Sequence, residues 1–371
     1  MTFLNLNTQY KSIKKEIDRA IKRVLDGGVF IGGAEVEEFE KEVAKFCGSA
    51  YGLGVNSCTD ALYLSLKALE IGRGDEVITT PFTFIATAEV IANLGAKPVF
   101  VDIESDTFNI NPGLVEGLIT SKTKAIMPVH LFGQMADMDR IMSIAKKYKL
   151  KVIEDAAQAI GAKYKNKMAG DIGDVGCFSF FPSKNLAALG DGGMVVTGNK
   201  KTANKIRLLK NHGSSPNEKY LNLILGTNSR LDALQAAILR VKLKHLAKWS
   251  KKRAEKARYY SKNLKGVGDI EVPRVGPNRT HIFHQYTIRT KSRDKLQKYL
   301  KEKGIPTMTY YPLPLHLQPA FKYLGYRNSD FPEAEKAAKE VLSLPIYPEL
   351  SISDQKKIIK TISEFFNISS R

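Results

Sequence analysis

The 371-residue sequence has few cysteines, no long apolar run and no internal repeat or low-complexity tract. Cys47, Cys58 and Cys177 are too few and too scattered for a disulfide framework or a metal cage. No stretch reaches the ~18 consecutive apolar residues of a membrane span. The start, MTFLNLNTQYKSIKKE, lacks the charged and then apolar layout of a secretory signal. We therefore expect a cytoplasmic protein with no bound metal and no membrane partner.

Acidic residues are outnumbered, with 38 Asp and Glu against 57 Lys and Arg, and the formal net charge is +19. A basic balance of this size raises the possibility of nucleic-acid binding. The basic residues, however, are spread along the chain in short groups such as Lys251-Lys252-Arg253, without a zinc spacing, an RNA-binding signature or a basic tail. We expect no nucleic-acid partner, and a basic surface would instead concentrate an anionic substrate.

Between residues 59 and 200, short apolar runs alternate with segments of helical period. The runs expected to form strands are DEVITT, AKPVFVDI, KAIMPVH, KVIEDA, VGCFSF and GGMVVT, and helical patterns include Ala86–Leu94 and Asp139–Tyr148. This alternation predicts the α/β class, with a large, mostly parallel sheet covered by helices on both faces. Ligands of such sheets bind at the carboxyl ends of the strands.

A long cationic helical segment, from residue 231 to about 265, leads to a second region. There a strand-like HIFHQYTIRT, a helix near 292–302, the loop TYYPLPLH and two more helices indicate a smaller α+β unit. We predict a large ligand-binding domain over residues 1–245 and a small C-terminal domain over residues 246–371. Whether the N-terminal helix packs on the small domain is left open.

Two acids end the apolar run of VIEDAAQAIG, and the second of them, Asp155, could simply cap the next helix. About thirty residues later, CFSFFPSKNLAALGDGG places Lys184 among Phe178, Phe180 and Phe181. A lysine that loses part of its hydration there has a lowered pKa and a nucleophilic amine, as Schiff-base chemistry requires. The alternative is a solvated surface charge.

Two further stretches could hold the rest of a ligand. NSCTDALYLSLKAL places Ser57 and Thr59 before a helix, where they form either a plain N-cap or a phosphate cradle. TTPFTFIATAEVI brings Phe84 to a strand-to-helix junction, either to stack on a flat ligand or to fill the core. Together with Asp155 and Lys184, these features are the set that a phosphorylated pyridine aldehyde needs.

The ordered series NSCTDAL, PFTFIATA, PVHLFGQMADM, VIEDAAQAIGA, GDVGCFSFFPSKNL, GDGGMVVT and GTNSRLDALQAAIL spans most of the chain. In this order it resembles the sugar aminotransferase family of the DegT/DnrJ/StrS type, pyridoxal 5'-phosphate (PLP) enzymes of the aspartate aminotransferase fold, fold type I. Within that family the sequence is most similar to the enzymes that aminate nucleotide-linked 3-keto sugars.

The resemblance implies a role for each matched residue. Lys184 would form the imine with the cofactor and shuttle the proton, and Asp155 would pair with the pyridine nitrogen. Gln158 would contact the cofactor ring, and Phe84 would stack on it. The residues expected to hold the phosphate are Ser57, Cys58 through its backbone, Thr59, Ser179 and, from the neighbouring subunit, Asn228. A homodimer with shared sites is therefore expected.

The reaction so implied moves an amino group from glutamate to a nucleotide-linked keto sugar. The small Ser229 after Asn228 favours a 3-keto-6-deoxyhexose linked to thymidine diphosphate (dTDP), and a 4-keto sugar is the alternative. A sugar dehydratase would have histidine in place of Lys184, and a non-catalytic regulatory protein would be expected to lack Lys184 or Asp155. The candidates for lining the sugar-nucleotide pocket are His281, His284, Tyr286, Tyr310, Tyr311 and His316, and a packing or surface role explains each of them at least as well.

Overall fold

The structure is a computed structural model that describes residues 1–369. Its first half contains α1 (Leu6–Gly27), α2 (Ala34–Cys47), β1 (Tyr51–Val55), α3 (Cys58–Ala68), β2 (Glu76–Thr79), α4 (Ala86–Asn93), β3 (Lys97–Phe100), β4 (Thr123–Ile126), α5 (Met138–Tyr148) and β5 (Lys151–Asp155). Its second half contains β6 (Lys163–Tyr164), β7 (Lys167–Met168), β8 (Val175–Ser179), β9 (Gly193–Thr197), α6 (Lys200–Leu209), α7 (Ala233–Leu264), β10 (Tyr286–Arg289), α8 (Arg293–Glu302), α9 (Pro332–Glu340), β11 (Val341–Leu344) and α10 (Ile352–Ser369).

The main sheet has seven strands in the order β1-β9-β8-β5-β4-β2-β3. The pairs from β8 through β5, β4 and β2 to β3 are parallel, and only β9 runs against its two neighbours. All six predicted strands are present, and β1 is an additional one. The prediction of an α/β fold with a mostly parallel sheet is confirmed.

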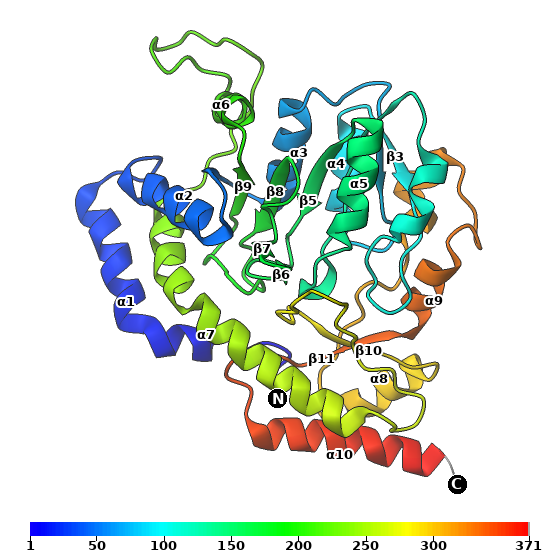
Figure 1. Cartoon of the computed structure of the whole chain (residues 1–371). Coiled ribbons are helices and arrows are strands. Elements are labelled where there is room, and N and C mark those ends of the chain that lie inside the picture. Colours follow the sequence, from blue (N-terminus) through cyan, green and yellow to red (C-terminus); the bar gives the residue numbers. More distant parts are fainter. Residues whose placement is uncertain (370–371) are drawn as a thin grey trace.

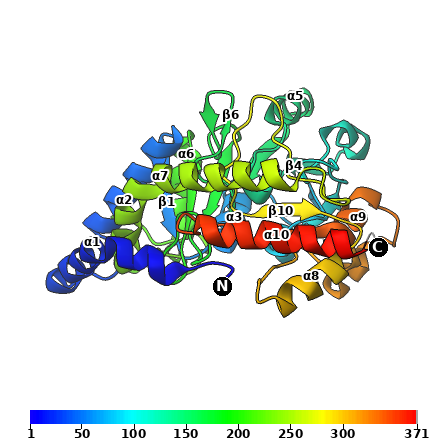
Figure 2. The same cartoon turned by 90° about the horizontal axis from the view of Figure 1, so that it is seen from below.

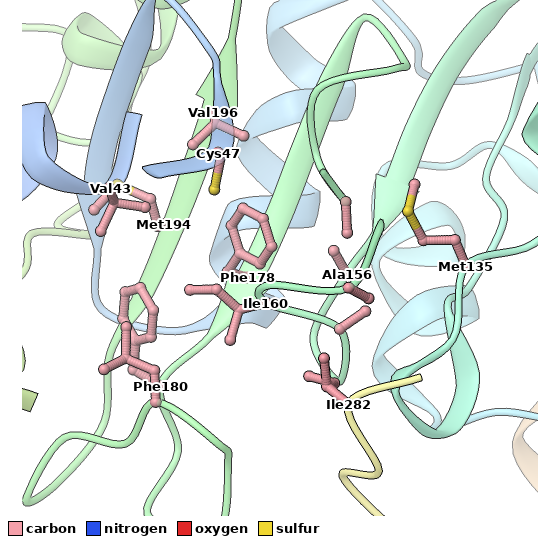
Figure 3. Close-up of a cluster of buried hydrophobic side chains, with 14 of the residues drawn as sticks. Val43, Cys47, Met135, Ala156, Ile160, Phe178, Phe180, Met194, Val196 and Ile282 are labelled. Atoms are coloured by element: carbon pink, nitrogen blue, oxygen red, sulfur yellow. The ribbon is translucent and has the colours of Figure 1, made fainter. Parts of the chain in front are cut away.

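Helices cover both faces of this sheet, and a separate apolar cluster fills the space on each face. One cluster joins the sheet to α2, α5 and α7 and includes Val43, Phe178 and Phe180 (Figure 3). The other lies under α3, α4 and α6 and includes Leu62, Ile91 and Ile206. Because both faces are covered, only the edges and the strand ends of the sheet are available to a ligand.

The helix α7 runs unbroken through the predicted domain boundary at residue 245. Beyond it, the two-stranded sheet β10-β11 lies beside α8 and α10 (Figure 2). Side chains from these elements and from α7 form a third apolar cluster. The N-terminal helix α1 packs along α7 through Ile13 and Ile17, while Leu4, ahead of α1, packs against the third cluster. The domain boundary itself stays a prediction.

Part of the C-terminal region also packs against the main sheet. Phe321 and Phe331 lie edge-on to Phe100 at the end of β3. Asp102 accepts hydrogen bonds from the first-turn N–H groups of Glu333 and Ala334 and so fixes the start of α9. Within residues 1–369 no helix is both long and apolar enough to cross a membrane.

Candidate active site

A cavity of about 370 Å³ lies where the parallel strands end. Its walls come from the segments that follow β1, β2, β4, β5 and β8, from the residues just before β9, and from residues 284–285 and 310–311 of the C-terminal region. Eight of the nine predicted site residues line it: Ser57, Cys58, Thr59, Phe84, Asp155, Gln158, Ser179 and Lys184. The structure therefore brings together residues that are up to 127 positions apart in the sequence, from 57 to 184.

The last residue of β5, Asp155, presents its carboxylate to this cavity. It accepts hydrogen bonds from Thr87 Oγ1 at 2.8 Å and from the Ala157 N–H at 3.2 Å, and its exposure is 4%. Burial raises the pKa of this carboxyl, and the two hydrogen bonds and the Lys184 charge offset only part of that rise. No cationic group of the described chain forms an ion pair with it, so a cationic ligand group fits this position. The contact with Thr87 was not predicted.

The preceding residue, Glu154, projects to the opposite side of the strand, as alternation in a strand requires. It is fully buried and accepts hydrogen bonds from His130 Nε2 at 2.9 Å and from the N–H groups of Gly170, Ile172 and Gly173. Burial alone would raise the pKa of Glu154, but the His130 bond and the backbone donors leave it lowered. Glu154 therefore anchors the loop before β8, while Asp155 serves the cavity.

Lys184 lies on the loop after β8, and its side chain lines the cavity. Burial lowers the pKa of its amine, with the nearby Cys58 and Asp155 opposing that shift. The predicted lowering of the Lys184 pKa agrees with this direction, but the aromatic residues predicted to cause it are partly wrong. Phe178 and Phe180 belong to the buried apolar cluster of Figure 3. Of the three phenylalanines, Phe181 alone lines the cavity.

The start of α3 closes one end of the cavity. Ser57 Oγ caps the helix by accepting the Asp60 N–H at 3.1 Å, and the N–H groups of Cys58 and Thr59, which precede Asp60, have no intrahelical partner. A Cβ at Gly193 would lie 2.4 Å from the Ser57 carbonyl group, so only glycine allows β9 to approach this turn. Burial raises the pKa of the Cys58 thiol well above its usual range, which keeps the thiol neutral. The site suits an anion bound by backbone groups.

Two side chains flank the middle of the cavity. Gln158 Nε2 donates to Tyr311 Oη at 3.1 Å, and its amide oxygen is buried without a hydrogen-bond partner. Phe84 is 58% exposed on the cavity wall, so it is free to stack on a ligand rather than serving the core. The orphaned amide oxygen and the exposed ring both fit a planar polar ligand.

The ninth predicted residue, Asn228, lies outside this cavity. It is exposed and lines an adjoining hollow of about 430 Å³ with Asn56 and Arg230, and Asp191 borders both spaces. Ser229 is fully buried, with its Oγ 3.1 Å from Asn56 Oδ1. Within one chain Ser229 therefore lines neither space, and the argument that its small size makes room for a sugar gains no support.

The six candidates for the sugar-nucleotide pocket divide into two groups. His284, Tyr310 and Tyr311 line the cavity. Tyr286 and His316 do not, because Tyr286 is fully buried in the third apolar cluster and His316 is buried against Glu335. His281 stacks on Phe283 and borders a separate small hollow. The structure therefore supports packing for Tyr286 and His316, and a pocket role of His281 stays a prediction.

Comparison with known sequences identifies close relatives over almost the whole chain. The model of the DegT/DnrJ/EryC1/StrS aminotransferase family matches residues 11–363. The "Pleiotropic regulatory protein" of Geobacillus stearothermophilus is 53% identical over 98% of both chains. The UDP-N-acetyl-3-dehydro-alpha-D-glucosamine 3-aminotransferase of Acidithiobacillus ferrooxidans is 47% identical, covering 94% of this chain and 93% of that one. The dTDP-3-amino-3,6-dideoxy-alpha-D-galactopyranose transaminase of Aneurinibacillus thermoaerophilus is 45% identical, covering 98% and 99%.

Among solved structures, the crystal structure of S. venezuelae DesV in complex with a ketimine intermediate superimposes with a TM-score of 0.96. It is 43% identical and is covered over 98% of both chains. The likeness in both sequence and structure extends over both regions of the chain, including every segment that lines the cavity.

Proposed function

This chain belongs to the DegT/DnrJ/EryC1/StrS aminotransferase family, and we propose that it uses PLP to transfer an amino group from glutamate to a nucleotide-linked 3-keto sugar. The fold is fold type I of PLP enzymes. The observation that carries the proposal is that Lys184 and Asp155, the two residues that PLP chemistry most needs, line one cavity.

The residues present fit the cofactor. A buried carboxylate without a cationic partner suits a protonated pyridine nitrogen, and the unpartnered oxygen of Gln158 suits a polar group on the ring. The glycine-restricted turn at Ser57 suits a phosphate. We assign Lys184 as the residue that holds the cofactor covalently. The residues assigned to the phosphate are Ser57, Cys58, Thr59 and Ser179, and those assigned to the ring are Phe84, Asp155 and Gln158.

When bound, PLP supplies an electron sink and carries the amino group between the two substrates. The chain's own residues perform the rest of the chemistry. The Asp155 carboxylate holds the proton on the ring nitrogen. The Lys184 amine, whose pKa is lowered by burial, takes the proton from the glutamate carbon that loses the amino group, and in the second half of the reaction it delivers a proton to the sugar carbon that receives the amino group. Thr87 keeps Asp155 oriented through its hydrogen bond.

The acceptor is proposed to be a 3-keto sugar, most specifically a dTDP-3-keto-6-deoxyhexose that yields the 3-amino-3,6-dideoxyhexose. Support for carbon 3 comes from the two relatives named above, both of which are 3-amino-sugar enzymes by name. They differ in the nucleotide, and dTDP matches the 6-deoxy relative. A panel of dTDP- and UDP-linked 3-keto and 4-keto sugars, each with glutamate, tests this by mass and NMR analysis. Amination at carbon 4 alone would refute the regiochemical proposal and leave the aminotransferase proposal standing.

A homodimer with shared sites is supported by the surroundings of Asn228. Next to it, the turn between α1 and α2 exposes Val29, Phe30 and Ile31 by about half of each side chain. The loop after α6 projects from the body and exposes Leu225 (Figure 1). Apolar surface around a polar residue suits a subunit interface. In the proposed dimer, Asn228 of each chain reaches the phosphate of the other.

A regulatory role is the second candidate, because the 53% identical relative carries a regulatory name. Both Lys184 and Asp155 are present in this chain, so a loss of catalysis has no support in its site. Absorbance spectroscopy separates the two functions. A protein that binds PLP as a yellow complex and is bleached by glutamate is a working aminotransferase, whatever further role it has.

A further inference from the structure

Two contacts hold the segment 282–284 beside the cavity. A Cβ at Gly133 would lie 2.8 Å from Ile282 Cγ1 and 3.0 Å from the His284 N–H nitrogen, so glycine is required there. The buried Arg253 also donates from Nη1 to the carbonyls of Phe283 at 3.1 Å and Ile346 at 2.9 Å. This arrangement fixes the backbone that carries His284 and leaves its imidazole little freedom.

The hydrogen bonds of Asn185 determine which nitrogen of His284 carries the proton. Asn185 Nδ2 donates to the Ile282 carbonyl at 3.3 Å, so its Oδ1 is the atom that faces His284 Nδ1 at 3.2 Å. Nδ1 therefore donates, and Nε2 has a free lone pair. Burial, together with the charges of Lys184 and Arg253, lowers the pKa of His284 well below its usual value. Nε2 has no hydrogen-bond partner within residues 1–369, so a neutral acceptor is available to a ligand.

His284 also lies between two spaces. It lines the main cavity with Lys184, and it lines a second cavity of about 340 Å³. The second cavity has no charged side chain, and its apolar walls include Phe3, Leu4, Met308 and Ile346. Ser183, Gln285 and Tyr310 also line this cavity. A space without a charged side chain is unsuited to the carboxylates of glutamate, whereas these three polar side chains can bond the hydroxyl groups of an uncharged sugar ring.

We propose that His284 is a substrate-binding residue for the sugar alone, with Nε2 accepting a hydrogen bond from a hydroxyl of the ring that extends into the second cavity. This rests on the proposed function. Asn185 is the positioning residue that holds the imidazole in the accepting tautomer. A neutral imidazole accepts from a hydroxyl without gaining charge beside the Lys184 amine, so the sugar half of the reaction gains orientation while the chemistry at Lys184 is unchanged.

Two substitutions separate this role from a structural one. In His284→Asn, the amide nitrogen replaces Nδ1 and still donates to Asn185, but nothing replaces Nε2. In His284→Gln, the amide oxygen reaches the position of Nε2 and restores an acceptor. Each half-reaction is followed separately by stopped-flow absorbance, using glutamate with the PLP form and the stable 3-amino sugar with the same form.

The expected result is a loss of about tenfold to a hundredfold in kcat/KM for the amino sugar in His284→Asn, with the glutamate half-reaction changed less than about twofold. His284→Gln should recover part of the loss. Equal slowing of both half-reactions, no slowing of either, or failure of both variants to fold would overturn the inference. The wild-type protein is measured in the same series. If the wild type reacts with neither substrate, the proposed function is wrong. If it reacts with both, the results for the variants test only the role of His284.

Discussion

Gly193→Ala should weaken PLP binding through a steric effect at the phosphate end of the site. The added Cβ would lie 2.4 Å from the carbonyl carbon and oxygen of Ser57 and 2.8 Å from the Cys58 nitrogen. All of these are backbone atoms, so no side chain can move aside. Restoring ordinary contact at 3.4 Å requires β9 and the start of α3 to separate by about 1 Å. Crowding of this kind costs about 1–3 kcal/mol of folding free energy.

The larger effect should fall on the cofactor. A 1 Å shift takes the first-turn N–H groups of Cys58 and Thr59 out of hydrogen-bond range of a phosphate held by the rest of the site. A hydrogen bond to a charged group contributes about 1.5–3 kcal/mol, so losing two amounts to about 3–6 kcal/mol, or a factor of roughly 10² to 10⁴ in Kd. The expected phenotype is a folded protein that needs far more PLP for activity.

Titration of the apo-protein with PLP, followed by absorbance and by the rise in Tm, measures this change. Gly198→Ala is the matched control, because that glycine follows the same strand and a Cβ there meets nothing within 4 Å. The control should bind PLP like the wild type. If Gly193→Ala also bound PLP with wild-type affinity, the turn at Ser57 would not be the phosphate site.

Four other substitutions test the remaining assignments. Lys184→Ala should abolish transfer and the absorbance of the lysine-bound cofactor without unfolding the protein, and turnover near wild type would exclude that assignment. Asp155→Ala should lower kcat by orders of magnitude and shift the cofactor spectrum, because nothing then keeps the ring nitrogen protonated. Mixing inactive Lys184→Ala with inactive Asn228→Ala protein should regenerate some intact sites if subunits share them, and no recovery in verified mixed dimers would refute sharing. Glu154→Gln should lower the free energy of unfolding, measured by urea denaturation, by about 3 kcal/mol. Because the pKa of Glu154 is lower in the folded state than in the unfolded state, its stabilising contribution is present above the unfolded pKa and is lost as the pH falls through the folded pKa. The wild type and the variant should therefore have similar free energies of unfolding in acid.

The sequence predicted the strands of the parallel sheet because each is a short apolar run bounded by polar or turn residues. It did not predict β1, whose YGLGV contains two glycines that weaken a strand pattern. The structure explains one of them. A Cβ at Gly52 would lie 2.3 Å from the Glu40 carbonyl oxygen, so α2 can pack this close to β1 only because residue 52 has no side chain. Such close approaches depend on tertiary packing, which one sequence does not reveal.

The cavity residues were predictable for a different reason. Asp155 ends the predicted strand β5 and Phe84 follows the predicted strand β2, and the carboxyl ends of parallel strands meet at one edge of a sheet. Ser57 was predicted from the start of the helix that follows it, without the strand before it. The prediction that Phe178 and Phe180 remove hydration from Lys184 was wrong, because both side chains lie in the core. Tyr286 was wrongly predicted as a candidate for the sugar-nucleotide pocket, because its ring is fully buried although it carries a polar hydroxyl group.

Transfer of labelled nitrogen tests the central claim most directly. The purified protein with PLP is incubated with [15N]glutamate and the dTDP-3-keto-6-deoxyhexose, and the sugar product is analysed by mass spectrometry. The account predicts a 15N-labelled amino sugar at carbon 3, formed with 2-oxoglutarate and absent with Lys184→Ala. A PLP complex that neither bleaches with glutamate nor yields labelled sugar from any nucleotide-linked keto sugar of the panel would contradict it.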